Sequence, residues 1–147
     1  MKLVIHNKGG SWGGNEKWLA TVAVGLIRRG HQVTVSCPPG PVEAELSRRG
    51  IPTTPIRPGG ILQVANALRF TRWLRSEQPD ALLLTSWTAT FWGSWAGKWA
   101  DTNRIVVRLG IVRTLKWSLE AVAFRYWVDA IVVNSAQIRN AWLRASR

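Results

Sequence analysis

The chain of 147 residues has the length of one ordinary domain, and its 46% hydrophobic content excludes a disordered or fibrous protein. Twenty Lys and Arg residues against eight Asp and Glu give a net charge of +12, which implies either an anionic partner or a solvated, arginine-rich surface. No apolar run approaches the roughly 20 residues that span a bilayer, no secretory signal opens the chain, and Cys37 stands alone, so we expect a cytoplasmic protein.

Strands and helices alternate through the first half of the sequence. The apolar run Lys2–His6 predicts a buried strand, and the glycine-rich segment 9–14 predicts a loop after it. A helix should follow and end at Gly30, because apolar residues recur every three or four positions: Trp18, Leu19, Val22, Ala23, Leu26 and Ile27. We then expect a strand at Gln32–Ser36, a helix at Val42–Arg49 and, because of its prolines, an edge strand or irregular segment at Pro52–Arg57.

The second half continues the alternation. Residues 61–77 predict a helix whose apolar positions face inward and whose arginines face outward; the inward set is Ile61, Val64, Ala65 and Leu68, and the outward set is Arg69, Arg72 and Arg75. Apolar runs predict strands at Ala81–Thr85, Arg104–Leu109 and Ala130–Val133. Helices are expected at Thr88–Ala100, between Leu115 and Tyr126, and after Ser135, which should cap the last one.

This order of elements predicts a Rossmann-like α/β fold. The strands are short apolar runs without polar alternation, as expected when helices cover both faces of a parallel sheet. The sheet is therefore expected to be mainly parallel and doubly wound. No internal repeat or linker interrupts the chain, so residues 1–147 should form a single domain.

Ligands of such folds bind beyond the carboxyl ends of the strands. That rule selects five places, which are the loop Asn7–Gly14, the turn Cys37–Pro41, the turn Ser86–Trp87, the loop Gly110–Thr114 and the cap Asn134–Ser135. The first loop is the most informative, because glycines ahead of a helix let backbone N–H groups approach an anion such as a phosphate. A tight turn would need the same glycines, so both readings stay open.

Two common nucleotide motifs are absent from this loop. The spacing of Gly9, Gly10, Gly13 and Gly14 does not give G-x-G-x-x-G, and Ser36 ends the second strand where a ribose-binding acid would stand. The P-loop pattern is missing as well. Dinucleotide binding and P-loop chemistry are therefore disfavoured.

Several motifs resemble the N-terminal half of retaining GT-B glycosyltransferases of family four. The run Gly13-Gly14-Asn15-Glu16, its helix, and the run 26–35 (LIRRGHQVTV) are similar to the family's G-G-x-E, helix and L-x-x-R-G-H-x-V-x-V. Further similarities follow in order at 47–51 (SRRGI), 78–80 (QPD) and 129–135 (DAIVVNS). Together they cover nearly the whole chain.

The resemblance implies one half of a GT-B fold, the acceptor-binding side. Such an enzyme moves a sugar from a nucleotide-sugar to a lipid-linked or saccharide acceptor, as in cell-envelope or polysaccharide synthesis. The family also has a C-terminal domain, which binds the nucleotide-sugar and carries two glutamates eight positions apart; no two glutamates here have that spacing, so we expect that domain to be absent from this chain. We expect a truncated chain, or one whose second domain is a separate polypeptide, with little or no transfer activity alone.

The same resemblance suggests site residues. It implies that Gly13 and Gly14 lie near the donor's diphosphate, and that Glu16 organises the first helical turn beside them. Candidate acceptor or phosphate contacts are Trp12, Arg108 and Arg113, although the two arginines would equally suit an exposed surface. A catalytic histidine is not supported after the fifth strand, and catalytic residues stay unassigned. The two histidines are read as structural, and no metal or other cofactor is expected.

Ten tryptophans leave one alternative function open. Trp92, Trp95 and Trp99 share a helical face, which predicts packing onto the sheet. Alternatively, they could anchor the protein with its arginines on the anionic inner face of a membrane. The competing hypothesis is thus a non-catalytic basic module that binds a membrane or a nucleic acid. A nucleic acid is the less favoured of these partners, because the sequence contains no known nucleic-acid-binding motif.

Overall fold

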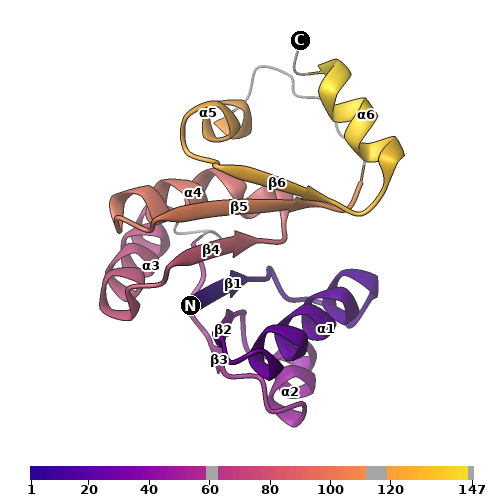
Figure 1. Cartoon of the computed structure of the whole chain (residues 1–147). Coiled ribbons are helices and arrows are strands. Elements are labelled where there is room, and N and C mark those ends of the chain that lie inside the picture. The colour runs from indigo at the N-terminus through magenta and orange to yellow at the C-terminus, as the bar shows by residue number, and fades with distance from the viewer. Residues whose placement is uncertain (59–62, 112–118, 146–147) are drawn as a thin grey trace.

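A computed structural model describes residues 1–58, 63–111 and 119–145 of the chain, and within them six parallel strands form one sheet (Figure 1). The strands are β1 (Lys2–His6), β2 (Gln32–Ser36), β3 (Thr53–Thr54), β4 (Ala81–Leu84), β5 (Arg104–Leu109) and β6 (Ala130–Val133). Their order is β3-β2-β1-β4-β5-β6, and every neighbouring pair is parallel. The predicted Rossmann-like α/β fold is confirmed.

Helices join the strands and bury both faces of the sheet. They are α1 (Gly14–Arg28), α2 (Pro41–Arg48), α3 (Gln63–Glu77), the 3₁₀ turn η1 (Trp87–Ala89), α4 (Thr90–Trp99), α5 (Leu119–Tyr126) and α6 (Ala136–Ala145). One core cluster gathers apolar side chains of α1, α2 and β2, and the other gathers those of α3, α4, β4 and β5. The sheet is therefore doubly wound, as predicted, and its strand order reverses between β1 and β4.

The segment after α2 forms only a two-residue edge strand. β3 pairs with β2 through Val35 with Thr53 and Ser36 with Thr54, and it lies at the end of the sheet. Pro52 and Pro55 flank it directly. Because proline has no N–H to give to a ladder, the strand cannot extend in either direction, which fits the predicted edge position.

The predicted inward face of α3 is wrong for the described residues. Val64 and Leu68 are 58% and 42% exposed and Ala65 is exposed, while Ile61 lies outside the described residues. The buried stripe instead runs through Ala67, Phe70, Thr71 and Leu74. Phe70 and Leu74 together carry more apolar surface than Val64 and Leu68, because phenylalanine is larger than valine, so burying them removes more surface from water. The arginines at 69, 72 and 75 are exposed as predicted.

Helix α4 turns small residues, not tryptophans, toward the sheet. A Cβ atom on Gly93 would lie 2.7 Å from Leu84 Cδ2, and one on Gly97 would lie 2.9 Å from Leu82 Cδ2. The indoles of Trp92, Trp95 and Trp99 contact one another in a row, with ring centroids 6.2 and 5.7 Å apart. Trp95 reaches the edge of the core, but Trp99 is 58% exposed. The expectation that this row packs onto the sheet is therefore wrong.

No helix within the described ranges has both the length and the apolar character needed to cross a membrane.

Candidate functional site

A pocket of about 580 Å³ opens where the carboxyl ends of β1, β4, β5 and β6 meet the following loops. Its lining residues are Lys8, Gly14, Asn15, Thr85, Ser86, Trp87, Thr88, Arg108, Leu109, Gly110, Ile111 and Asn134. Four of the five places selected from the sequence contribute to this wall, and the turn Cys37–Pro41 does not. The pocket spans the reversal point between β1 and β4, where doubly wound sheets bind ligands.

The four glycines of the glycine-rich loop form two pairs with different roles. Gly9 and Gly10 have φ angles of +74° and +117°, so they, and not Gly13 or Gly14, take the backbone conformations that other residues avoid. Gly14 begins α1 and lines the pocket, and the space that its Cβ would occupy is open. The missing side chain at Gly14 therefore leaves the start of α1 accessible from the pocket.

Glu16 holds the entry to α1 in place. Its Oε2 accepts the Gly13 N–H at 3.1 Å, and its Oε1 accepts Asn7 Nδ2 at 3.2 Å and Asn15 Nδ2 at 3.1 Å. Partial burial alone would raise the pKa of Glu16, but the hydrogen bonds from Asn15, Asn7 and Gly13 outweigh it and lower that pKa. The carboxylate does not line the pocket; its hydrogen bonds hold the first turn of α1.

The N–H groups of Gly14 and Asn15 have no hydrogen-bond acceptor among the described residues. Both residues belong to the first turn of α1, where the N–H groups point out of the helix and carry its partial positive charge. Both also line the pocket. The start of α1 thus offers the pocket two free donors suited to an anion.

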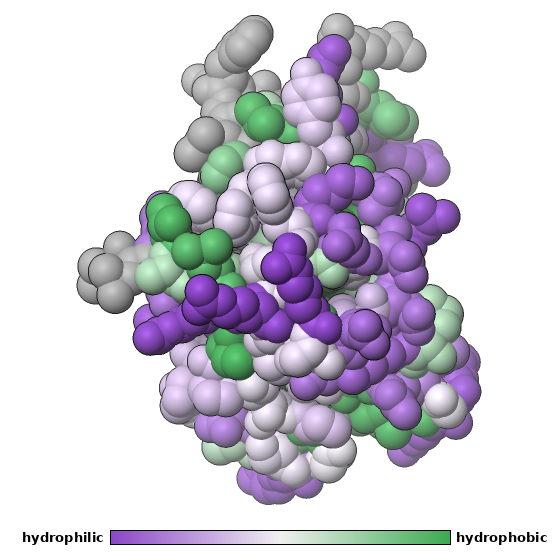
Figure 2. Space-filling view, turned by 90° about the vertical axis from the view of Figure 1, so that its left-hand side faces the viewer, coloured by the Kyte–Doolittle hydropathy of each residue, from purple (hydrophilic) through white to green (hydrophobic). Residues whose placement is uncertain are grey.

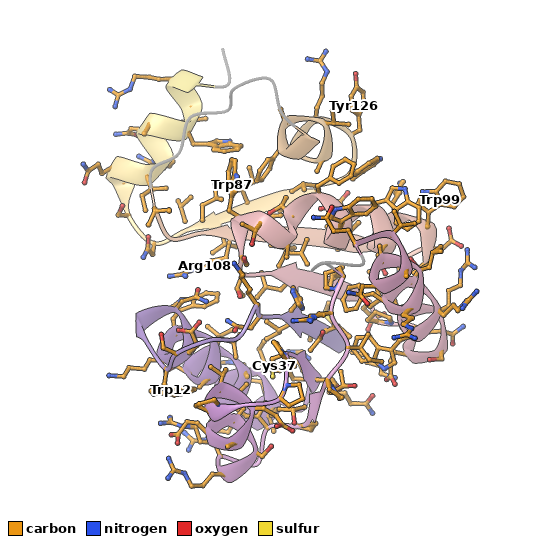
Figure 3. The ribbon with its side chains drawn as sticks, turned by 180° about the vertical axis from the view of Figure 1, so that it is seen from behind. Trp12, Cys37, Trp87, Trp99, Arg108 and Tyr126 are labelled. Atoms are coloured by element: carbon orange, nitrogen blue, oxygen red, sulfur yellow. The ribbon has the colours of Figure 1, made fainter. Side chains whose placement is uncertain are left out.

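Arg108 is buried at the end of β5, with a relative exposure of 9%. It donates to Asn15 Oδ1, its guanidinium carbon lies 4.6 Å from the centroid of the Trp18 ring, and its Nε has no partner within the described ranges. Burial lowers the pKa of Arg108, and the nearby Glu16 carboxylate partly restores it. Of the two readings of this arginine, the exposed surface is therefore wrong, and the side chain stands fixed against the first turn of α1 (Figure 3).

Three polar residues at the site were not singled out from the sequence, although two of them lie in the loop Asn7–Gly14. Asn7 Nδ2 donates to Thr85 Oγ1 at 3.3 Å, and Thr85 Oγ1 donates to the His6 carbonyl at 3.0 Å, so these buried side chains tie the ends of β1 and β4 together. Lys8 follows Asn7 and lines the pocket. Their one sequence signal was position, because Asn7 and Lys8 come just after β1 and Thr85 comes just after β4.

The structure does not bring all the suggested contacts together. Trp12 is absent from the pocket wall; it packs beside the α1–α2 core, and the Arg49 guanidinium carbon lies 5.1 Å from its ring centroid. Figure 3 shows Trp12 on the side of α2, apart from Arg108. Arg113 lies outside the described residues. Gly13 sits at the N-cap of α1, one residue before the pocket wall.

Buried His6 makes the stability of the fold depend on pH. Burial lowers the pKa of His6 from 6.5 to about 4, against a partial rise from its hydrogen bond with Ser36. The unfolded chain therefore binds a proton below pH 6.5 that the folded chain takes up only near pH 4, so acid favours unfolding. We expect His6 to cost about 2 kcal/mol of unfolding free energy between pH 7 and pH 5. Urea titrations should show this loss in the natural chain and a smaller one in His6→Gln; equal losses in both would contradict it.

Solved structures share this fold at low sequence identity. Anabaena HepE in complex with UDP matches 99% of the chain and 41% of its own, with a TM-score of 0.77 and 16% identity. The lipopolysaccharide outer core galactosyltransferase WaaB matches 100% and 43%, with a TM-score of 0.72 and 14% identity. The UDP-GlcNAc 2-epimerase of Neisseria meningitidis, bound to UDP-GlcNAc, matches 100% and 44%, with a TM-score of 0.70 and 17% identity.

The chain spans about two fifths of the length of each of these proteins, and the strands and helices described above correspond to that part. No curated protein sequence matches the chain. The sequence model for Glycosyltransferase Family 4 matches residues 12–146, which is nearly the whole chain. The chain therefore belongs to Glycosyltransferase Family 4 and has the Rossmann-like fold of one half of a GT-B glycosyltransferase.

Proposed function

We propose that this chain is the acceptor-binding, N-terminal domain of an enzyme that transfers a sugar from a nucleotide-sugar to a lipid-linked or saccharide acceptor. Its family membership and the UDP bound by HepE, which shares its fold, support a nucleotide-sugar as donor. WaaB, named for the lipopolysaccharide outer core, supports an acceptor of the cell envelope. A second domain, in the same polypeptide or in a separate one, would complete the donor site.

The observation that carries this proposal is the electrostatics of the pocket. Lys8 and Arg108 line it together with the start of α1, and within the part of the chain that the structure describes no carboxylate lines it. Cationic side chains and free helix N–H groups are the usual partners of a phosphate. The pocket therefore suits the diphosphate of a nucleotide-sugar, with Gly13 and Gly14 beside it and Glu16 holding the helical turn.

The same groups would assist the chemistry. When the bond between sugar and nucleotide breaks, negative charge grows on the leaving diphosphate. Fixed donors such as the Gly14 and Asn15 N–H groups and the Arg108 guanidinium would stabilise that charge without having to reorganise. Because Arg108 is already held by Asn15 and Trp18, it would be aimed at the diphosphate before the donor arrives.

A transfer assay tests the function. A panel of nucleotide-sugars is offered with saccharide and lipid-linked acceptors to the 147-residue chain and to the chain extended through the reading frame that follows Arg147. We expect transfer by the extended chain and little or none by the short one, because half of the donor pocket would be missing. Absence of transfer by both, with a folded pocket, would refute the proposal.

The tryptophan row favours a second role, attachment to a membrane surface. α3 and α4 lie side by side, joined by Trp92 Nε1 to Gln63 Oε1 at 2.9 Å and by Arg75 Nη2 to the Trp99 carbonyl at 2.6 Å. Exposed Trp99, Val64 and Leu68 stand among arginines there, and Figure 2 shows hydrophilic side chains lying across hydrophobic ones on the side of the molecule that carries α3. Indole rings beside cations suit the interface of an anionic bilayer.

This role predicts an effect of Trp99→Ser. We expect the variant to bind vesicles of phosphatidylcholine with 30% phosphatidylglycerol about 5-fold more weakly in a sedimentation assay, because the apolar anchor is lost. Tyr126→Ser, which removes an exposed aromatic ring of α5, is the matched control and should bind like the natural chain. Equal binding by all three proteins would show that the tryptophan row does not anchor the chain on a membrane, and the peripheral location would be unsupported.

A further inference from the structure

A second pocket, of about 610 Å³, lies between α3 and the segment that follows β3. It is lined by Pro55, Ile56, Arg57, Asn66, Arg69, Arg72, Trp73 and Ser76, and we refer to it as the α3 groove. It shares no residue with the pocket at the start of α1. Four of the lining residues from α3, at positions 66, 69, 73 and 76, recur every three or four positions, so they lie along one side of that helix. The function proposed above makes no use of this groove.

Three arginines converge on the α3 groove from two elements. Arg57 follows β3, and Arg69 and Arg72 stand one turn apart on α3. No hydrogen bond or ion pair links any of their side chains to another described residue, and no Asp or Glu lines the groove. Like charges gathered without a counter-charge repel one another, so an anion that entered the groove would be favoured.

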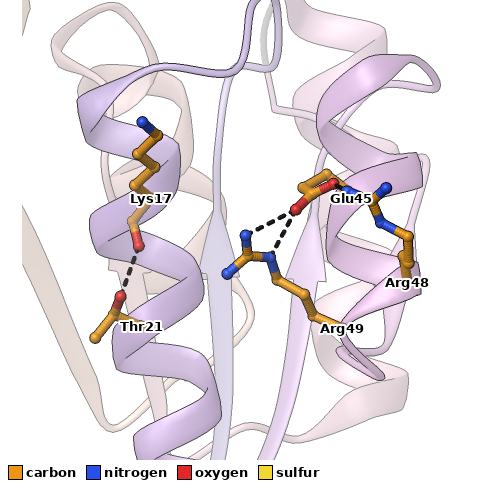
Figure 4. Close-up of polar contacts among 5 residues, drawn as sticks. All are labelled: Lys17, Thr21, Glu45, Arg48 and Arg49. Atoms are coloured by element: carbon orange, nitrogen blue, oxygen red, sulfur yellow. Dashed lines mark hydrogen bonds and ion pairs between the residues drawn. The ribbon is translucent and has the colours of Figure 1, made fainter.

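The arginines at the end of α2, unlike those of the α3 groove, have a carboxylate partner. Glu45 receives both Arg48 and Arg49, and Arg49 Nη2 lies 2.7 Å from Glu45 Oε1 (Figure 4). Glu45 and Arg48 both lie on α2, and Arg49 caps that helix one turn after Glu45, so these charges are neutralised locally. α3 offers its groove no such acid, since its one carboxylate, Glu77, pairs with Lys2 at 2.8 Å.

The neutral lining of the groove narrows the class of ligand. Trp73 is half-buried and rests on Phe70, with ring centroids 5.6 Å apart, so its indole forms a fixed wall. Asn66 and Ser76 add short polar side chains on the same flank. Guanidinium groups bind phosphate through paired hydrogen bonds, and an aromatic wall beside them suits the organic part of a phosphate ester.

We propose that the α3 groove is a phosphate-binding site, distinct from the pocket assigned to the donor's diphosphate. Arg69 and Arg72 hold the phosphate from one side and Arg57 holds it from the other, while the face of Trp73 contacts the group that carries the phosphate. The ligand is a phosphate ester, either in solution or as the headgroup of an anionic lipid. These two sources share the same chemistry at the groove and differ in the experiment.

A pair of charge-matched variants tests this site. Arg69→Gln with Arg72→Gln removes two groove charges, and Arg139→Gln with Arg144→Gln removes two exposed charges from α6. Binding of inorganic pyrophosphate is measured by calorimetry at 50 mM salt, and every protein also carries Arg108→Gln, because the pocket at the start of α1 would bind a diphosphate too. We expect the groove variant to bind at least about 10-fold more weakly than the chain with Arg108→Gln alone, and the α6 variant to bind within about 2-fold of it. Circular dichroism melting of both variants shows that the fold is intact.

The outcomes separate the two sources and can overturn the site. Pyrophosphate binding that only the groove variant loses supports a soluble phosphate ester. Loss confined to vesicles of phosphatidylcholine with 30% phosphatidylglycerol, with vesicles of phosphatidylcholine alone unaffected, supports a lipid headgroup. Equal weakening in both variants would show a general effect of net charge, and no binding of either probe by the natural chain would show an empty groove; each overturns the proposal. Sugar transfer by the extended chain tests the other pocket separately.

Discussion

Replacing Arg108 by glutamine is expected to lower kcat/KM for sugar transfer by the extended chain at least about 100-fold, the scale observed when one fixed donor to a developing anion is removed. Arg108 is the one arginine that lines the pocket at the start of α1, within the part of the chain that the structure describes. Glutamine keeps a polar side chain but loses both the charge and the paired donors. The measurement is steady-state transfer with the best donor of the panel.

Arg104→Gln is the matched control for this prediction. It changes the same residue type on the same strand, but Arg104 is exposed at the opposite end of β5. Transfer by that variant should stay within about 2-fold of the natural value. Arg108→Lys separates charge from geometry, since lysine keeps the charge but cannot form the paired bonds. Full activity of Arg108→Gln, with an unchanged melting temperature, would remove Arg108 from the site.

The α/β fold could be predicted because its signals are local. Most predicted strands are apolar runs too short for a helix, and the glycines at 30 and 50 follow the helices that they end. The parallel sheet follows from the regular alternation of strands and helices. Because the carboxyl ends of parallel strands share one edge, the same reasoning also located most of the pocket wall.

The sequence predicted where the candidate site lies, but not which side chains contact one another there. Gly14 and Arg108 were selected as single residues, and both line the pocket. The bond between Arg108 and Asn15 joins residues 93 positions apart, and the bond between Asn7 and Thr85 spans 78. No local pattern encodes such pairs, because they depend on the register of β1, β4 and β5 in the sheet.

The orientation of α4 was mispredicted for a physical reason. Periodicity identifies which residues share a face, but the largest apolar side chains were then assumed to face the core. α4 lies so near β4 and β5 that only small residues fit between them, and Gly93, Ala96 and Gly97 occupy that contact. The tryptophans were therefore displaced toward α3 and the surface. Where a helix packs this closely on a strand, only small side chains fit between them. A hydropathy pattern does not show how close the two backbones lie.

Gly97→Leu is expected to destabilise the fold by about 3 kcal/mol and lower the melting temperature by about 10 °C. Its Cβ alone would lie 2.9 Å from Leu82 Cδ2 and 3.0 Å from Ile105 Cδ1, so the whole leucine cannot enter without moving α4 away from the sheet. Lys98→Leu adds the same side chain one position later, where the helix is exposed, and should melt within about 2 °C of the natural chain. Thermal unfolding followed by circular dichroism compares the two. If Gly97→Leu melted at the same temperature as Lys98→Leu, the close contact of α4 with β4 and β5 would be wrong. Packing of the tryptophan row onto the sheet would then again be the expected arrangement.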